Sequence, residues 1–284
     1  MRFTKMQGVG NHFVVVAEED THFASLPELS LNLCARATGA GADGLLVIGP
    51  GEGEYAFTFR MFNPDGTEDM CGNGLRCACL WSYRREPSRW NIGDPFTVWT
   101  KEGARLCRLV SVEADTQGAI VEVDMGRPKF APLDIPCLAP SGTEKVLGHI
   151  LDVNGQSYPI NCVNTGSAHT ILFRNAAPEE ETFLRDSPLI ENHPFFPERT
   201  TVLWAWPMGP NHLGIRIWER GAGETWGCGT GACAVAVLAI EKGVVQSGPV
   251  VVESRGGRLD IAWPERDAMR MTGPAEAVFE GTVL

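Results

Sequence analysis

The chain has 284 residues, of which 44% are hydrophobic and 21% are charged, and its formal net charge is −11. These values predict a soluble globular protein of one large domain or two ordinary ones, and they exclude a disordered chain. They also argue against a nucleic-acid partner, because phosphate binding depends on clustered Lys and Arg and this acidic chain shows no basic stripe.

Neither membrane insertion nor secretion is expected. A membrane span needs roughly 18 unbroken apolar residues, and the best candidate, TGACAVAVLAIEKG at 230–243, is too short. The first residues, MRFTKMQGVGNHF, lack the basic flank and apolar run of a secretory signal. The nine cysteines are odd in number and scattered, which is more typical of reduced thiols than of a disulfide framework. We therefore expect a cytoplasmic protein with no membrane partner.

Short apolar runs with Gly and Pro between them dominate the first half. They predict a strand at 12–18, a weak helix at 26–37 and strands at 44–50 and 55–63, the last alternating strictly between its two faces. A helix is expected at 75–85. Further strands are expected at 95–103 and 119–126.

The second half repeats this character. An acidic stretch at 175–182 is typical of a loop. A helix at 232–242 is apolar almost all round, which is typical of a helix buried on every side. The strands expected in this half cover 169–175, 200–206, 213–221, 249–257 and 258–265. Many short strands with two buried helices predict a β-rich architecture.

Two stretches, MCGNGLRC at 70–77 and GCGTGACA at 227–234, each place a cysteine before Gly-x-Gly and directly before one of those helices. A boundary near 126–132 leaves one such turn in each half, so the chain looks internally duplicated. We expect domains at 1–127 and 128–270, with 271–284 joining the first.

These two cysteines, Cys71 and Cys228, differ from the others in their surroundings. Unpaired N–H groups and the positive dipole end at a helix start stabilise a thiolate and bind anions. A carboxylate held by 72–74 on one side and 229–231 on the other would lie between two sulfurs. A thiol has a reference pKa of about 8.5, so one can be thiolate while its partner is thiol. Such a pair suits inversion of a stereocentre, with a base on one face and an acid on the other.

The remaining cysteines are expected to be small core residues. A zinc site is not expected either, because CGNGLRCAC at 71–79 has no paired C-x₂-C and no neighbouring His.

Over essentially its whole length the chain resembles the diaminopimelate epimerase family, which are cofactor-independent amino-acid racemases. The resemblance is carried by KMQGVGNHF (5–13), GAGADGLL (39–46), MFNPDGTEDMCGNGLRCA (61–78), NTGSAH (164–169), FPERTTV (196–202) and ERGAGETWGCGTGACA (219–234).

The resemblance implies an α/β (α+β) fold of two pseudo-symmetric domains, each a mixed or antiparallel barrel-like sheet around a central helix. It implies a site in the cleft between them and interconversion of L,L- and meso-diaminopimelate, a step of lysine and peptidoglycan precursor biosynthesis. Neither pyridoxal phosphate nor a metal is implied, and a homodimer is possible.

Site residues also follow from the resemblance. Cys71 and Cys228 would be the opposed acid and base, with His169 and Glu219 as their polar supports. Asn11, Asn63 and Arg220 would hold the distal amino-acid end, to which the bidentate guanidinium of Arg220 is suited. The substrate-binding residues implied are Asn11, Asn63, Gly72, Asn73, Ser167, Thr201, Arg220, Gly229 and Thr230.

Some positions depart from the family pattern. Ser167 and Ala168 stand where Asn and Pro are expected, and Thr201 replaces another Asn; His12 and Gly44 differ as well. The asparagines that match Ser167 and Thr201 contact the distal carboxylate in the family, and the shorter hydroxyls would need a bridging water. An alternative function is therefore racemisation of a different amino acid. A second alternative is a thiol redox sensor or binding module, which would not need the surrounding polar residues.

Overall fold

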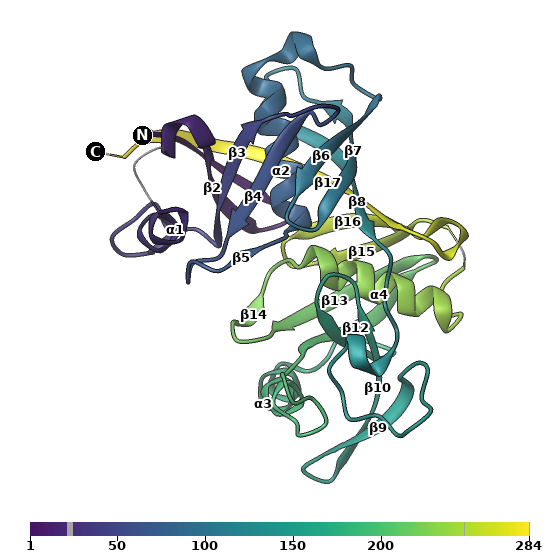
Figure 1. Cartoon of the computed structure of the whole chain (residues 1–284). Helices are drawn as coiled ribbons and strands as arrows, with labels where there is room; N and C mark the ends of the chain where they lie inside the picture. The colour runs from purple at the N-terminus through teal and green to yellow at the C-terminus, as the bar shows by residue number, and fades with distance from the viewer. Residues whose placement is uncertain (22–24, 247, 284) are drawn as a thin grey trace. The chain divides into compact units, whose positions relative to one another are not determined.

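The computed structural model describes residues 1–21, 25–246 and 248–283 (Figure 1). The chain divides into two compact units. Unit 1 comprises Met1–Asp124 and Thr272–Leu284, and unit 2 comprises Met125–Met271. Each unit combines many strands with few helices, which confirms the expected α+β class.

The strands of unit 1 pair into a closed ring. Neighbours in the ring are β1/β2, β2/β3, β3/β4, β4/β6, β6/β7 and β7/β8, and β17 closes it by pairing with both β1 and β8. Pairs β2/β3 and β4/β6 are parallel and the other registered pairs are antiparallel. The strands are β1 (Arg2–Gly8), β2 (Asn11–Ala17), β3 (Gly44–Pro50), β4 (Phe57–Phe62), β5 (Glu68–Asp69), β6 (Pro95–Thr100), β7 (Gly103–Val112), β8 (Gly118–Gly126) and β17 (Met269–Thr282).

Of the α-helices among the described residues of unit 1, α1 lies outside this ring and α2 lies inside it. Helix α1 (Leu26–Cys34) packs its buried Leu33 and Cys34 on the outside, against β3 and β4. Helix α2 (Gly72–Arg85) contacts β1, β2, β3, β4 and β7, so the strands surround it (Figure 1). Its residues from Gly72 to Trp81 are buried, as expected of a helix inside a ring.

Unit 2 repeats the same order of pairings. Pairs β10/β11, β12/β13 and β15/β16 are antiparallel, whereas β11/β12 and β13/β15 are parallel, as in the corresponding pairs of unit 1. The elements are β9 (Leu147–Val153), β10 (Gln156–Asn164), β11 (Ala168–Phe173), α3 (Glu180–Glu191), β12 (Thr201–Gly209), β13 (His212–Glu219), β14 (Gly223–Thr225), α4 (Gly229–Glu241), β15 (Val250–Ser254) and β16 (Gly257–Ala262). The order of elements therefore occurs twice in the chain.

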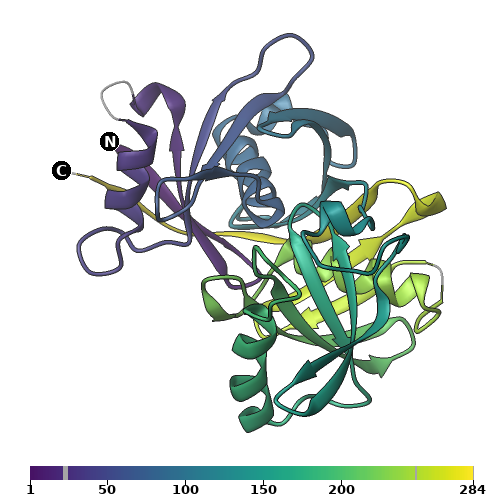
Figure 2. The same cartoon turned by 60° about the horizontal axis from the view of Figure 1, so that its bottom comes forward.

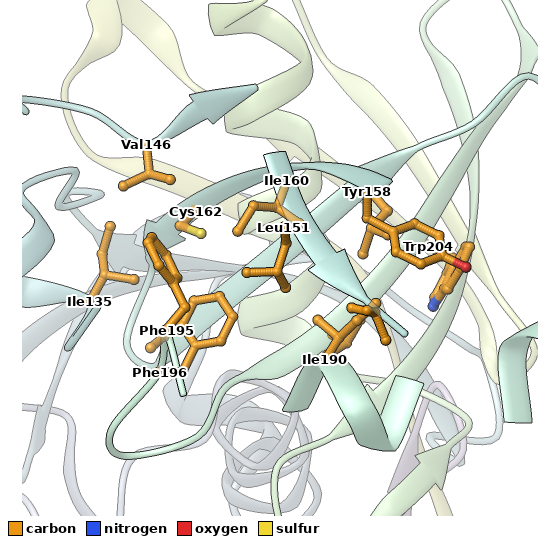
Figure 3. Close-up of a cluster of buried hydrophobic side chains, with 14 of the residues drawn as sticks. Ile135, Val146, Leu151, Tyr158, Ile160, Cys162, Ile190, Phe195, Phe196 and Trp204 are labelled. Atoms are coloured by element: carbon orange, nitrogen blue, oxygen red, sulfur yellow. The ribbon is translucent and has the colours of Figure 1, made fainter. Parts of the chain in front are cut away.

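Helix α4 is the counterpart of α2. It contacts β10, β11, β12, β15 and β16, and its residues from Gly231 to Ala239 are buried. Helix α3 packs outside the strands of this unit, as the green helix in Figure 2 shows, against β9, β12 and β13. Between α3 and the sheet lies a cluster of buried side chains that includes Tyr158, Ile190 and Trp204 (Figure 3).

The helix bounds differ from those expected. Helices α2 and α4 begin at glycines, three residues before the predicted starts. The cysteine N-cap stabilises the first helical turn there, although glycine has a poor helix propensity. Helix α1 ends at Cys34 rather than at 37. Helix α3 begins inside the acidic stretch expected to be a loop and contains Pro188, which hid it from the sequence pattern. No helix in the described part of the chain combines the length and apolar character needed to cross a membrane.

Candidate functional site

Cys71 and Cys228 occupy the same position in the two units. Each is the N-cap of a central helix, with φ −137° and ψ 114° at Cys71 and φ −137° and ψ 110° at Cys228. Each sulfur accepts a hydrogen bond from the backbone N–H three residues on, at 3.4 Å from Gly74 and 3.3 Å from Gly231. Both thiols therefore face the positive end of a helix, where a thiolate is stabilised.

The second glycine of each Cys-Gly-x-Gly turn lets the helix start lie against a strand. A Cβ on Gly74 would lie 2.9 Å from a methyl carbon of Leu46 in β3, and one on Gly231 would lie 2.8 Å from a methyl carbon of Leu203 in β12. Leu46 and Leu203 are the third residues of their strands. In both units, the close contact between this glycine and a leucine of a neighbouring strand therefore sets the position of the cysteine.

In unit 1, Asn11 brings its carboxamide oxygen to the first turn of α2. This oxygen lies 3.7 Å from the Cys71 sulfur and 3.4 Å from Nδ2 of Asn73. The Asn11 amide nitrogen donates to Oδ2 of Asp43 at 2.9 Å, and that oxygen also accepts the backbone N–H of His12 at 3.0 Å. Asp43 thus fixes which end of the amide faces the sulfur. We call Cys71, Asn11, Asn73 and Asp43 the Cys71 cluster.

Unit 1 also holds the predicted residues Gly72, Asn73 and Asn63. Gly72 and Asn73 are buried in the first turn of α2, where backbone N–H groups have no intrahelical partner, and Oδ1 of Asn73 has no hydrogen-bond partner among the described residues. Asn63 lies in the turn that follows β4, and its amide donates to Oγ1 of Thr67 at 3.1 Å. Asp43 was missed by sequence reasoning, although it lies in the stretch GAGADGLL directly before β3.

In unit 2, a row of hydrogen-bonding groups runs from a histidine to the cysteine. Nε2 of His169 lies 3.1 Å from Oγ of Ser167. That hydroxyl lies 3.5 Å from Oγ1 of Thr230, which lies 3.3 Å from the Cys228 sulfur. We call these four residues the Cys228 cluster. Gly229 is buried between Cys228 and Thr230 in the first turn of α4.

His169 is a neutral member of this cluster. The residue has no exposed surface. Burial, together with the positive charge of Arg220, lowers the pKa of His169 to about 3. Near neutral pH the imidazole therefore acts through a hydrogen bond and not through a positive charge.

Arg220 lies at the end of β13 in a loop that other residues hold. Its backbone N–H donates to Oγ1 of Thr201 at 3.2 Å, and its exposed guanidinium donates to the carbonyl of Glu198 at 3.3 Å. Thr201 is only 4% exposed. Its hydroxyl therefore supports the Arg220 backbone. Glu219, the last residue of β13, is half-buried and pairs with Gly223 of β14.

Glu191, at the end of α3, fastens the same loop and was not singled out in the sequence. Its carboxylate accepts the backbone N–H of Gly221 and the indole N–H of Trp218, both at 2.8 Å. The residue is 5% exposed. The only sequence signal for Glu191 was its place in helix α3, which was not predicted because its acidic start was expected to be a loop.

A protein-family model described as diaminopimelate epimerase matches residues 3–131 and 161–278 of this chain. The chain belongs to the diaminopimelate epimerase family. A protein of Microcystis aeruginosa named diaminopimelate epimerase is 41% identical, over 98% of this chain and 97% of its own length. One of the same name from Pelotomaculum thermopropionicum is 39% identical, over 99% and 98%.

A solved structure of a hydroxyproline epimerase from Agrobacterium vitis matches the fold of this diaminopimelate epimerase family member. The TM-score is 0.72 at 13% identity, covering 100% of this chain and 90% of the other. At that identity the match concerns the fold, and it confirms the fold class expected from the family resemblance.

Proposed function

We propose that this chain is a diaminopimelate epimerase, an isomerase that interconverts the L,L and meso forms of diaminopimelate in lysine and peptidoglycan precursor biosynthesis. Family membership supports this activity, as do relatives of that name at near-full coverage. The observation that carries it is the repeated cysteine N-cap, because one thiol at each of two equivalent helix starts supplies a matched acid and base.

In this proposal Cys71 and Cys228 act from opposite faces of one α-carbon. The thiolate of one cysteine removes the α-proton, and the thiol of the other delivers a proton to the opposite face. One C–H bond breaks and another forms, so the stereocentre inverts and the two sulfurs exchange protonation states. The reverse reaction uses the same groups in the opposite roles.

The first turns of α2 and α4 would bind the reacting carboxylate. The backbone N–H groups of Gly72, Asn73, Gly229 and Thr230 point out of helix N-termini, which favour an anion. The same groups stabilise the negative charge that spreads from the α-carbon onto the carboxylate during proton removal. This charge stabilisation needs neither pyridoxal phosphate nor a metal, and we propose that the enzyme uses neither.

Asn11, Asn63 and Arg220 would bind the distal amino-acid end of the substrate. The exposed guanidinium of Arg220 is free to turn toward a carboxylate, because its present acceptor is a single backbone carbonyl. Ser167 and Thr201 already use their hydroxyls on the Cys228 cluster and on the Arg220 backbone. This observation favours one second candidate, a racemase for an amino acid with a different distal end.

The site of action and the assembly are also proposed. All nine cysteines lie in the described residues and are free thiols, which supports a cytoplasmic location. We propose a homodimer because β7 and β8 expose Leu106, Val110 and Ile120, at 46%, 44% and 38%. Molar mass by light scattering tests the dimer.

The activity is tested by incubating the reduced protein with L,L-diaminopimelate and separating stereoisomers by chromatography. Appearance of the meso isomer supports the proposal. A panel of lysine, arginine and phenylalanine runs in parallel, and inversion of one of these without inversion of diaminopimelate supports the second candidate. A reduced protein that inverts no amino acid contradicts both racemase proposals.

A further inference from the structure

The turn between β10 and β11 is attached to the first turn of α4. The Thr165 hydroxyl donates to the Thr230 carbonyl at 2.8 Å, and Thr165 is 1% exposed. The next residue, Gly166, has φ +112°, and a Cβ there would lie 3.1 Å from the Thr230 methyl carbon. This attachment fixes the backbone of the turn, and the fixed backbone places Ser167 between His169 and Thr230.

The row from His169 to Cys228 can be polarised in one direction along its whole length. A hydroxyl donates one hydrogen bond while accepting others, and a neutral imidazole can donate from Nε2. With Nε2–H donating to Ser167, Ser167 donates to Thr230 and Thr230 donates to the sulfur. A thiolate accepts such a bond, and hydrogen bonds to ionised acceptors are the stronger kind.

The equivalent position in unit 1 has the opposite polarity. The turn between β1 and β2 brings Asn11 to Cys71, as the turn between β10 and β11 brings Ser167 to Thr230. Because Asp43 takes the Asn11 amide hydrogen, the sulfur of Cys71 meets a carboxamide oxygen. A carbonyl oxygen only accepts, so this contact favours the S–H form of Cys71.

From this difference we propose that Ser167 is a positioning residue that makes Cys228 the thiolate of the resting enzyme. It links His169 to Thr230 and orients the Thr230 hydroxyl hydrogen toward the Cys228 sulfur, while Cys71 rests as the thiol. This assignment rests on the proposed function for its catalytic meaning, since it identifies Cys228 as the base for the first proton removal.

The hydrogen-bonded row orients the hydroxyl groups but does not transfer the substrate's α-proton. The α-proton passes from substrate carbon to the Cys228 sulfur, and the hydroxyls then rotate so that S–H donates to Thr230. His169 stays neutral throughout, consistent with its low pKa. No bond to hydrogen breaks on Ser167 or Thr230, so the step needs no further reactant.

Charged and titratable groups also lie on the elements around α4 and near their ends. Strand β11 contributes His169, and Glu219 and Arg220 lie where β13 ends. On β15 and β16, Glu253 is occupied by Arg258 and by His212. Glu219 and Arg220 are unchanged in the variants below, so their effects on the sulfur are constant across the comparison.

The test measures the rate of alkylation by iodoacetamide against pH, with each cysteine peptide quantified by mass spectrometry. In the unaltered protein the apparent pKa from the Cys228 peptide should lie below that from the Cys71 peptide. Ser167→Ala should raise the Cys228 value by about one unit, because the Thr230 hydroxyl is then no longer oriented to donate its hydrogen bond to the sulfur. Ser167→Thr keeps the hydroxyl and should restore it. The exposed Ser157→Ala is the matched control and should change nothing.

A second variant makes the test independent of how Ser167→Ala folds. Thr230→Val removes the group that contacts the sulfur while keeping the side-chain shape, so it should raise the Cys228 value as well. The double variant should raise it no further than Thr230→Val alone, because the two residues act in series. An unchanged Cys228 value in either single variant, or a lower value for Cys71 than for Cys228, overturns the proposal. Alkylation needs no substrate, so this result is distinct from failure of the racemase activity.

Discussion

The carboxylate of Asp43 accepts the amide hydrogen of Asn11 at 2.9 Å, and this bond decides which atom of Asn11 faces Cys71. The Asn11 carboxamide would otherwise be able to present its NH₂ group to the sulfur. Asp43 precedes β3, and the backbone N–H of His12 donates to the same carboxylate oxygen. A residue that touches no reacting atom therefore sets the polarity of the Cys71 cluster.

Asp43→Asn should lower kcat/KM for the proposed reaction by about tenfold, as expected for one misplaced hydrogen bond of about 1.4 kcal/mol. The isosteric amide can donate to Asn11 and let its carboxamide turn over. Steady-state kinetics measures the change. The exposed Asp94→Asn makes the same chemical change elsewhere in unit 1 and should leave kcat/KM unaltered. Equal activity of the two variants would remove Asp43 from the site.

Glu191→Gln should raise KM more than it lowers kcat. Glu191 holds the loop that carries Arg220 through Gly221, and Arg220 is proposed to bind the distal end rather than the reacting carbon. The change also weakens a buried hydrogen-bonding group, so Tm should fall, with a cost of about 1–3 kcal/mol. Glu181→Gln, exposed on the same helix, is the control. A fall in kcat at constant KM would contradict this role.

Gly166→Ala should destabilise the protein more than Gly155→Ala. Both glycines have positive φ, +112° and +80°, and each alanine incurs a backbone cost of about 1–2 kcal/mol. Only at Gly166 does the new methyl group also press on Thr230, since nothing lies within 4 Å of a Cβ on Gly155. Denaturant unfolding measures both free energies. Equal losses would mean that the turn tolerates displacement from α4.

Acid should destabilise the folded protein through His169. The pKa of His169 in the folded protein, about 3, lies below its ordinary value of 6.5. Between these two pH values the unfolded chain therefore binds a proton at His169 and the folded chain does not. Stability is therefore lost as pH falls from 6.5 toward 3, by on the order of 4–5 kcal/mol at 1.36 kcal/mol per unit.

The measurement compares the free energy of unfolding in urea at pH 7 and pH 5 for the unaltered protein and His169→Gln. The variant should lose the part of the pH dependence that His169 contributes. His149→Gln, at a half-buried histidine of the same unit, should keep it. An unchanged pH dependence in His169→Gln would show that another group controls acid unfolding.

Much of the fold could be predicted from the sequence because its signals are local. Cys-Gly-x-Gly before an apolar segment predicts a helix start, and both helices formed with the cysteine as N-cap. Helix α3 could not be predicted in this way. Its stability depends on Phe183 and Ile190 packing on the sheet, while its acidic start and Pro188 gave the opposite local signal.

The residues around the cysteines were less predictable. Ser167 and Thr201 were expected at the substrate from the family pattern, but the sequence could not tell that their hydroxyls contact His169 and the Arg220 backbone. Asp43 and Glu191 act through residues 32 and 30 positions away in the chain. Such contacts depend on the strand pairings, which no short motif encodes.

The most direct test of the two-cysteine mechanism is reaction of L,L-diaminopimelate in D₂O, followed by mass spectrometry of substrate and product. Early meso product should carry one deuterium while unreacted substrate carries none, because one thiol removes the proton and the other delivers a deuteron. Cys71→Ala and Cys228→Ala should each slow product formation by at least 10²–10⁴-fold. Deuterium in the unreacted substrate at the same rate as in product, or near-normal turnover in either variant, would contradict the account.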